Sequence, residues 1–511
     1  MHLRDTLLAS LAKLAGTREF HLHVLVSSPR KHTNLYPFAF PRPKTYLQNI
    51  LILLSEQATP DAPRLFVSAI EVFVYHIPST SSAVVYVSKV DSTGQATAPS
   101  PTPTLVNALV LYYVNPATRP LSVDHVWVHL FARAQSQYLF PNSADFAGKR
   151  PLTDMKLCAW WKHQLSSVAE ELHSQAGDTV RTRLYYLLPG MGELEASCSL
   201  ERIYSASSSV SWVYGHPYSQ TDVPLPGVSS RNASGTTHLG QIIPWFDDDP
   251  KARFIDEIAY TTEAEGVKSP ERKRARVDRV AVKSSEEGGE DHADADRKDT
   301  HNQKEEQTTR ALKKVSVSEF WERMSFRQEC IAGAVTGFFV MAVSSISLPS
   351  LPRSEPSPLA PQPGQVSPHL IKRVLTSLMN GHEFPSVERA AWSTKVLEES
   401  IKGLCDGLRP GPVVNVSTNS DSSGRRTPER SVTLGPPQTP PPRLVGGKYP
   451  IVDISPNPFP EPITSLETYH SYIYGALSVS NPELPRKTVA EDDGKPKVTV
   501  LTVRRKKRAK P

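Results

Sequence analysis

A long segment without aromatic residues constrains the fold of this chain most strongly. No Phe, Trp or Tyr occurs between Tyr260 and Phe320, and blocks of acidic and basic residues alternate over residues 262–313. Such a segment cannot bury enough apolar surface to offset the conformational entropy that is lost on folding. We therefore predict a disordered charged insert at 262–313 that interrupts the folded part of the chain.

Proline-rich stretches divide the rest of the chain. The sequence holds 46 prolines in 511 residues, roughly twice the usual share of about 5%. The predicted organisation is a first folded part at 1–261, a helical part at 314–407 that a proline-rich linker interrupts at 350–368, a disordered linker at 408–447, a C-terminal helix and strand within 448–503 and a basic tail at 504–511.

The first folded part carries both strand and helix signals. Residues 64–76 and 83–89 are rich in β-branched and aromatic side chains and predict two strands, followed by a turn at 91–94. Residues 105–114 are apolar on nearly every side and predict a buried helix or strand. Residues 155–173 predict a helix with a broad apolar face. Together these signals predict an α/β fold.

Helical spacing returns after the insert. Phe320, Trp321 and Met324 share one face of a predicted helix that begins near Ser318, and residues 369–407 are also predicted to be helical. A helix is expected at 466–474 and a strand at 498–503.

The sequence argues against a membrane segment, a disulfide framework and a zinc site. The four cysteines are widely spaced and form no C-x-x-C pair, which fits a reducing compartment. The apolar stretch at 331–343 is shorter than the roughly 20 residues that a span needs, so we predict a buried core helix there. Leu3, Leu7 and Leu11 predict an amphipathic helix rather than a secretory signal.

Three consecutive carboxylates, Asp247 to Asp249, lie between aromatic residues and Pro250. Their mutual repulsion and the exclusion of water predict a raised pKa for at least one of them, as a general base for a lysine ammonium would require. The alternative is structural, because Asp followed by Pro is typical of a helix start, with Asp249 as N-cap.

Aromatic and imidazole pairs give weaker signals. Trp160 and Trp161 are adjacent on the predicted helix and point about 100° apart, so one is expected to pack in the core and the other to line a pocket; burial of both is the alternative. His21 and His23 share one face of a predicted strand, but no third ligand lies nearby, so we predict no metal site.

Two basic runs, residues 272–276 and 504–510, favour nuclear import or contact with nucleic acid over a merely solvated charge run. The sequence contains no P-loop, nucleophile elbow or zinc-protease helix.

Several short motifs agree in order and spacing with one known family. They occupy residues 87–91 (VSKVD), 136–141 (SQYLFP), 160–161 (WW), 248–255 (DDPKARFI), 315–318 (VSVS), 320–321 (FW) and 327–329 (RQE). In these motifs the chain resembles the fungal, chaperone-dependent acetyltransferases that modify lysine fifty-six of histone H3. The resemblance implies a fold like the CBP-type acetyltransferase domain, with a central mixed β-sheet surrounded by helices.

The resemblance also implies roles for particular residues. Asp249, Asp248, Asp91, Tyr138 and Trp161 would form the catalytic pocket, and Lys251 would be an autoacetylated lysine. The residues implied to contact acetyl-CoA are Val90, Asp91, Ser92, Phe131, Gln135, Arg150, Pro151, Leu152 and Trp160. Where the family's cofactor loop continues past its glycine, this chain has the sequence PSPTP at 99–103, with no basic residue.

The implied function is transfer of acetyl from acetyl-CoA to a lysine of histone H3, without a metal, in the nucleus. The implied partners are histone H3–H4 and histone chaperones, in chromatin assembly and the DNA damage response. No membrane association is implied. The alternative to an enzyme is a non-catalytic nuclear scaffold that binds histones or chaperones. Direct DNA binding through the basic tail is compatible with the sequence but is not required.

Overall fold

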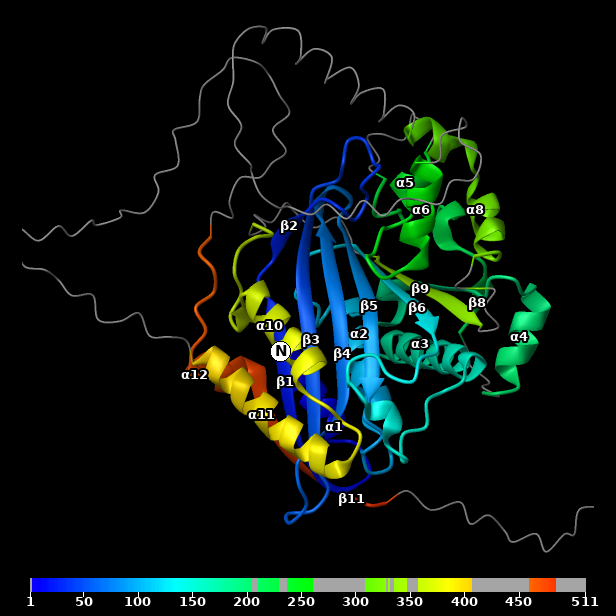
Figure 1. Ribbon diagram of the computed structural model, residues 1–511. Coiled ribbons are helices and arrows are strands. Elements are labelled where there is room, and N and C mark those ends of the chain that lie inside the picture. Colours follow the sequence, from blue (N-terminus) through cyan, green and yellow to red (C-terminus); the bar gives the residue numbers. More distant parts are fainter. Residues whose placement is uncertain are drawn as a thin grey trace, which may run out of the picture.

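Runs of β-branched and aromatic residues form a long mixed β-sheet at the centre of the molecule (Figure 1). The computed structural model describes residues 2–204, 210–228, 237–260, 308–327, 330, 335–346, 357–406 and 459–483. The strands within this part are β1 (Gly16–Ser27), β2 (Arg30–His32), β3 (Thr45–Gln57), β4 (Leu65–Ile77), β5 (Ser82–Ser92), β6 (His125–Arg133), β7 (Val180–Leu187), β8 (Trp212–Tyr214), β9 (Thr336–Ser345), β10 (Gln365–Val366) and β11 (Tyr474–Asn481).

Sheet order combines local hairpins with long crossovers. The main path is β10-β1-β3-β4-β5-β6-β9-β7-β8, while β11 pairs with β1 and β2 pairs with β3. The pairs β1–β10, β5–β6 and β7–β8 are parallel, whereas the pairs of β1 with β3, β3 with β4, and β9 with both β6 and β7 are antiparallel. The predicted central mixed sheet is therefore confirmed.

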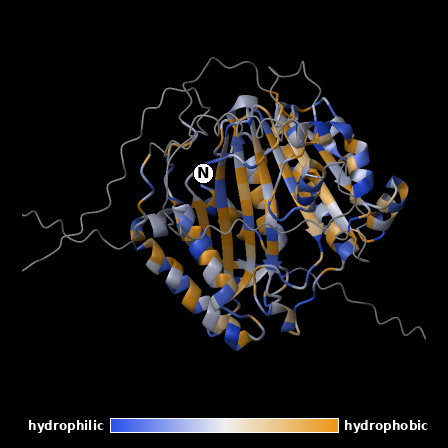
Figure 2. Ribbon diagram, turned by 45° about the horizontal axis from the view of Figure 1, so that its top comes forward, coloured by the Kyte–Doolittle hydropathy of each residue, from blue (hydrophilic) through white to orange (hydrophobic). Residues whose placement is uncertain are grey.

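Helices cover both faces of the sheet. They are α1 (Leu3–Leu11), α2 (Thr102–Val114), α3 (Asp154–Ala176), α4 (Glu193–Glu201), α5 (Leu239–Ile242), α6 (Pro250–Tyr260), α8 (Val317–Met324), α10 (Pro368–Gly381), α11 (Val387–Cys405) and the short α12 (Leu466–Thr468), which continues into a π-helical turn, Tyr469–Ile473. Apolar residues concentrate in the strands and along one side of each long helix (Figure 2).

The sheet separates several hydrophobic cores. On one face, α1, α2 and α3 pack against alternate residues of the strands. On the other face, α10 and α11 cover β1, β3 and β4, and α5, α6 and α8 pack at the opposite end near β9. Each strand in the middle of the sheet is thus buried on both sides.

The prediction of a core helix at 331–343 is wrong, because residues 336–345 form strand β9. All but the last residue of β9 are buried between β6 and β7. Phe339 and Met341 point into one core, while Val340 and Ala342 point into another. A strand buried on both faces has a continuous apolar sequence, so periodicity does not distinguish it from a buried helix.

Other predicted elements are confirmed with shifted ends. Strands β4 and β5, helices α1, α3 and α8, and the helical region that forms α10 and α11 all lie where the sequence placed them. The apolar residues 105–114 form α2, a helix. Strand β5 runs through Asp91 to Ser92, so the turn begins two residues later than predicted.

Two predicted boundaries need correction. Residues 308–314 are helical and Leu312 is buried, so ordered structure resumes inside the range given to the charged insert. Strand β10 and the first residue of α10 lie inside the predicted linker at 350–368. The predicted C-terminal strand at 498–503, the linker at 408–447, both basic runs and residues 262–307 of the insert lie outside the described residues.

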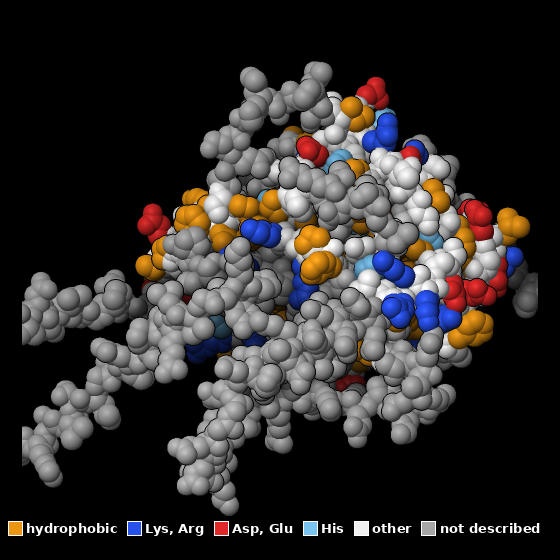
Figure 3. Space-filling view, turned by 90° about the horizontal axis from the view of Figure 1, so that it is seen from above, with side chains coloured by type: hydrophobic (Ala, Val, Ile, Leu, Met, Phe, Trp, Pro, Cys, Tyr) orange, Lys and Arg blue, Asp and Glu red, His pale blue; other side chains and the backbone are white. Residues whose placement is uncertain are grey.

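Charged side chains of both signs are distributed over the described surface. Seen from above, acidic side chains lie toward the edges of the molecule, and several Lys and Arg side chains lie beside acidic ones (Figure 3). Within the described ranges, no helix combines the length and the apolar character that crossing a bilayer requires.

Candidate active site

A cavity of about 460 Å³ opens where two parallel strands separate. Strands β5 and β6 pair from Ser82 and His125 as far as Val87 and Leu130. Beyond that point β5 stays with β4 until Ser92, and β6 stays with β9 until Arg133. The fork leaves room between the strands at their carboxyl ends, the place where α/β sheets commonly bind ligands.

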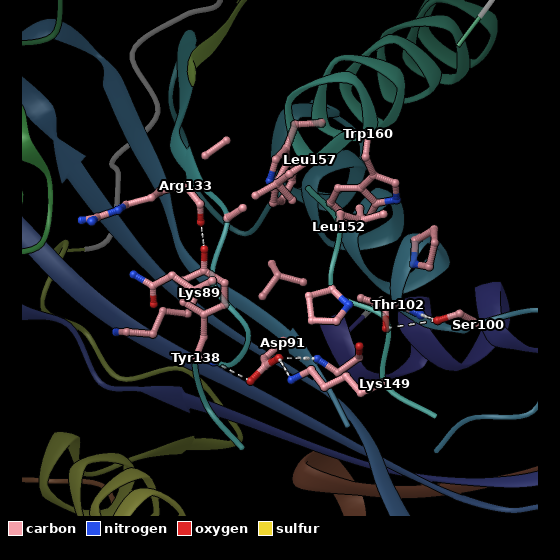
Figure 4. A pocket seen from close by; sticks show the side chains of 18 of the residues that line it. Lys89, Asp91, Ser100, Thr102, Arg133, Tyr138, Lys149, Leu152, Leu157 and Trp160 are labelled. Carbon is pink, nitrogen blue, oxygen red and sulfur yellow. Dashed lines mark hydrogen bonds and ion pairs between the residues drawn. The ribbon is translucent and has the colours of Figure 1, made fainter. Parts of the chain in front are cut away.

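All nine residues implied to contact acetyl-CoA line this cavity, as do Tyr138 and Trp161. The other lining residues include Ser88, Lys89, Gly94, Ser100, Thr102, Arg133, Lys149 and Leu157. They come from β5, β6, the start of α2, residues 134–152 and the first half of α3 (Figure 4). The roles of these residues in binding or catalysis stay predictions, but the structure brings them together.

Asp91 fixes the loop that forms one wall of the cavity. Its Oδ2 accepts hydrogen bonds from the backbone N–H groups of Tyr138 (2.7 Å), Leu139 (2.8 Å) and Phe140 (3.1 Å). Its Oδ1 accepts from the backbone N–H of Ser92 (2.8 Å) and from Lys149 Nζ (2.9 Å). Because five donors already occupy this buried carboxylate, Asp91 is suited to positioning the wall rather than to accepting a proton from a substrate.

Tyr138 and Trp160 lie on opposite sides of the cavity (Figure 4). The Tyr138 hydroxyl donates to the carbonyl of Arg133. Burial and the nearby charge of Asp91 raise the pKa of Tyr138 to about 12, so its hydroxyl is neutral. Trp160 is half-buried and Trp161 is buried in the core, with ring centroids 4.7 Å apart. Trp161 packs in the core and Trp160 is the more accessible, as predicted, but both line the cavity, so the predicted division of roles is only partly correct.

Carboxylates lie at the rim of the cavity around Ser88. The exposed Asp248 accepts hydrogen bonds from the Tyr86 hydroxyl (2.7 Å) and from Ser88 Oγ (2.9 Å). Glu71 lies within 3.2 Å of the same Ser88 Oγ and pairs with Lys89. The register between β4 and β5 shifts at this point, so a bulge turns the Ser88 segment. Asp248 is therefore beside the cavity although it does not line it.

Asp249 lies deeper than Asp248 and outside the cavity lining. It is fully buried, its Oδ1 accepts from the backbone N–H of Lys251 at 2.8 Å, and its Oδ2 pairs with the Lys251 ammonium group. Helix α6 begins at Pro250, so the predicted capping role is confirmed. Burial raises the pKa of Asp249, and the Lys251 charge opposes that shift. The pKa of Asp249 is thus raised as predicted, and of the two predicted causes the exclusion of water is larger than repulsion by Asp248.

Lys251 lines a separate space of about 10 Å³ that shares Leu130 with the larger cavity. Its ammonium group lies 4.5 Å from the centre of the Phe338 ring. His129, on the neighbouring strand β6, is buried, and desolvation lowers its pKa well below the ordinary value. The imidazole is therefore neutral and adds no positive charge beside Lys251.

Sequence reasoning missed Lys149, Gly94 and Glu71. Lys149 Nζ is bound between Asp91 and Ser143 Oγ (2.8 Å), and the two charged side chains are only 6% and 5% exposed. Gly94 has a φ of +80°, and a Cβ there would lie 2.5 Å from Lys149 Cα. Only the Asp-Ser-Thr-Gly turn pattern pointed to Gly94, and no local pattern identifies a lysine that a loop brings to a strand end.

The cavity fits an acyl donor with a long, partly apolar arm and an anionic end. Leu130, Leu157 and Trp160 supply apolar walls, and the exposed Arg150 supplies positive charge, whereas the Lys149 charge is neutralised by Asp91. Ser100, just before α2, and Thr102, its first residue, line another side near the positive end of the helix dipole. In the described ranges, no cluster of three or more His, Cys, Asp or Glu side chains could hold a metal ion.

Similarity to known proteins agrees with this geometry. The family described as the histone acetyltransferase KAT11-type domain matches residues 120–400, more than half of the chain. The chain is 26% identical over 422 residues to histone acetyltransferase rtt109 of Aspergillus flavus, covering 78% of this chain and 62% of that protein. The corresponding protein of Schizosaccharomyces pombe is 25% identical over 300 residues, covering 57% and 58%. The chain thus spans about three fifths of the length of these relatives.

A solved structure supports the fold. The crystal structure of Rtt109 from Aspergillus fumigatus aligns with a TM-score of 0.56 and 24% identity, covering 79% of this chain and 96% of the other. The likeness shows that a protein of known structure has the same fold, a central mixed sheet with flanking helices.

Proposed function

Because the chain belongs to the KAT11-type histone acetyltransferase family, we propose that it transfers acetyl from acetyl-CoA to the side-chain amine of a histone lysine. The observation that carries this proposal is the cavity at the β5–β6 fork. Eleven of the fourteen residues implied by the family resemblance line that one cavity, and carboxylates lie at its rim.

Binding of the donor would use side chains that are already held in place. Leu130, Leu157 and Trp160 would pack against the apolar arm, and Arg150 would contact the phosphates. Lys149 is paired with Asp91, so this buried ion pair holds the cavity wall in place. The acetyl donor supplies the thioester carbonyl carbon that the lysine amine attacks, and the thiolate of coenzyme A leaves.

Proton removal from the acceptor lysine would use the acidic rim. A lysine side chain is an ammonium ion at neutral pH and must lose a proton before it attacks a thioester. Asp248 and Glu71 lie beside Ser88, where they would attract the ammonium group as it enters the cavity. We assign Asp248 as the carboxylate that accepts the proton, because it is exposed, whereas Asp249 is buried and paired with Lys251.

Lys251 is the proposed autoacetylation site. Transfer of an acetyl group to it would remove the ammonium charge that now pairs with Asp249. The nearby neutral His129 and the Phe338 ring would accommodate an uncharged amide in this buried position.

The finer proposal concerns the substrate and its setting. We propose histone H3 within H3–H4 as the substrate, lysine fifty-six as the main acceptor, and a histone chaperone as the partner that presents it. The site of action would be the nucleus, in chromatin assembly and the DNA damage response. The motif resemblance supports this assignment, the similarity to two histone acetyltransferases supports a histone substrate, and the basic runs at 272–276 and 504–510 suit nuclear import.

The proposal is tested by incubating the full-length protein with isotopically labelled acetyl-CoA and H3–H4, with and without a chaperone. Site-resolved mass spectrometry should find the label on histone H3, mainly on lysine fifty-six, and on Lys251 of the enzyme. Label on H3 at other lysines would overturn only the finer assignment. A folded protein that transferred no label under either condition would support a scaffold instead.

A further inference from the structure

A second, larger cavity lies at the other end of the sheet. It has a volume of about 800 Å³ and is enclosed by the β1–β3 part of the sheet, the residue before β4, helix α11 and the π-helical turn Tyr469–Ile473. In Figure 1, α11 crosses in front of the strands at this end of the sheet. The cavity shares no lining residue with the one at the β5–β6 fork, so it is a separate space.

The floor of this second cavity presents a buried polar atom without a partner. The His23 ring is fully buried and lines the cavity. Its Nε2 lies 3.0 Å from the Tyr469 hydroxyl, but no residue of the described chain lies within hydrogen-bond distance of its Nδ1. A buried polar group of this kind costs free energy unless a ligand or water satisfies it.

Arg64 supplies a second unsatisfied group, and this one can only donate. Its Nη1 donates to Glu398 Oε2 at 2.8 Å, while Glu398 Oε1 accepts from Ser55 Oγ. Among the described residues, the buried Nε of Arg64 has no acceptor. Because a guanidinium is always charged and carries only donors, the missing partner must be an acceptor.

The rim adds positive charge and an aromatic surface. Trp392, Lys395, Glu399 and Lys402 are spaced three to four residues apart, so they lie along one face of α11. Glu398 is already occupied by Arg64 and Ser55, which leaves two lysines against one glutamate at the mouth. The Trp392 side chain is 55% exposed beside them.

We propose that this cavity is a binding site for a small organic anion whose phosphate or carboxylate group contacts Arg64, His23 and Lys395. A planar part of the same molecule would lie against Trp392. Both residues that carry an unsatisfied polar atom line a space whose volume is typical of small-molecule sites. Since the cavity and the acetyl-transfer site share no residue, the proposal stands or falls independently of the proposed function.

The test is calorimetric titration of the full-length protein with three probes: inorganic phosphate, adenosine monophosphate and citrate. We expect at least one probe to bind with 1:1 stoichiometry and a Kd below about 1 mM. Replacing Arg64 with Gln removes charge-assisted hydrogen bonds, so Arg64→Gln should weaken binding about tenfold or more. Lys395→Gln, on the exposed rim, should weaken binding without affecting folding, which a thermal melt checks.

Two matched controls locate the binding. Lys372→Gln removes an exposed lysine of α10 that does not line the cavity, and Arg150→Gln removes a cation from the other cavity. Neither control should change the affinity. Tighter binding of adenosine monophosphate than of phosphate, lost in Trp392→Ala, would support contact of the planar part with Trp392. The proposal is overturned if no probe binds up to about 10 mM, or if binding persists unchanged in folded Arg64→Gln and Lys395→Gln.

Discussion

Asp249 and Lys251 form an ion pair whose side chains are only 0% and 4% exposed. From sequence alone, Asp249→Asn is expected to change stability little, because Asn caps a helix about as well as Asp. The buried pair changes that expectation. Removing the carboxylate charge leaves the Lys251 ammonium uncompensated, and breaking a buried pair costs roughly 3 kcal/mol.

We therefore predict that Asp249→Asn lowers the free energy of unfolding by about 3 kcal/mol, measured by urea denaturation. The double variant Asp249→Asn, Lys251→Met should recover most of that loss, because no charge is then left buried. A single variant within about 1 kcal/mol of the wild type would show that the pair contributes little to folding.

Asp91 provides the second residue-scale prediction. Asp91→Asn cannot neutralise Lys149, and an amide cannot replace all five of the hydrogen bonds that the carboxylate accepts. We predict a loss of about 3 kcal/mol in stability and a higher KM for acetyl-CoA, because the wall at residues 138–140 is released. An unchanged KM in the folded variant would contradict the positioning role.

Single residues of the site could be predicted only where a motif carried them. Asp91, Tyr138 and the tryptophan pair came from short strings that resemble a family, and all of them line the cavity. Lys149 and Glu71 were missed because their partners are distant in the sequence, and nothing local marks them. The sequence also did not indicate that Asp248 is exposed and Asp249 is buried, since adjacent residues can differ completely in burial.

At the scale of elements, the conformation of the chain just after β5 depends on the close approach of the Gly94 and Lys149 backbones. Gly94 has positive φ and its α-carbon faces the Lys149 backbone. Gly94→Ala should push Lys149 away from Asp91 and raise the KM for acetyl-CoA about tenfold or more, since misplacement of about 1 Å can cost 10²-fold. Gly192→Ala is the control, because an added Cβ there meets nothing within 4 Å. Equal KM values for the two variants would contradict this account.

Element prediction succeeded where periodicity and composition agreed. The aromatic and β-branched runs of β4 and β5 and the amphipathic pattern of α3 identified those elements. Strand β9 failed because burial on both faces removes the alternation. Strand β11 was not predicted, because most side chains in its sequence YGALSVSN are small or polar. Only its antiparallel pairing with β1 makes it a strand.

At the scale of the whole molecule, segments that are distant in the sequence complete one sheet. Strands β10 and β11, from the last third of the chain, both pair with β1 near the N-terminus. The sequence predicted that the C-terminal part returns to the domain but not where it pairs, because register depends on tertiary contacts. Two buried histidines, His21 and His23, lie on β1, the strand with which β10 and β11 pair.

Because of these two histidines, we expect the free energy of unfolding to fall in acid. Burial lowers the pKa of His21 to about 4 and that of His23 to about 3. Their stabilising contribution is therefore complete above the unfolded pKa near 6.5 and is lost as pH falls toward 4. Each histidine contributes a slope of at most about 1.4 kcal/mol per pH unit. Urea unfolding between pH 7 and pH 4.5 should show a shallower slope in His23→Gln, and an identical slope would contradict the prediction.

The central claim is that the cavity at the β5–β6 fork, with Asp248 at its rim, transfers acetyl to a histone lysine. The most direct test is kcat for acetylation of H3–H4 by Asp248→Asn, with Asp247→Asn as the matched control. Both aspartates are exposed, but only Asp248 is hydrogen-bonded to Tyr86 and Ser88 in the described structure. We predict that Asp248→Asn lowers kcat about 10²-fold, the usual scale for a general base, while Asp247→Asn stays near the wild type. Equal turnover by folded Asp248→Asn and wild-type protein would contradict the assignment of Asp248, and absence of transfer by the wild type would contradict the central claim itself.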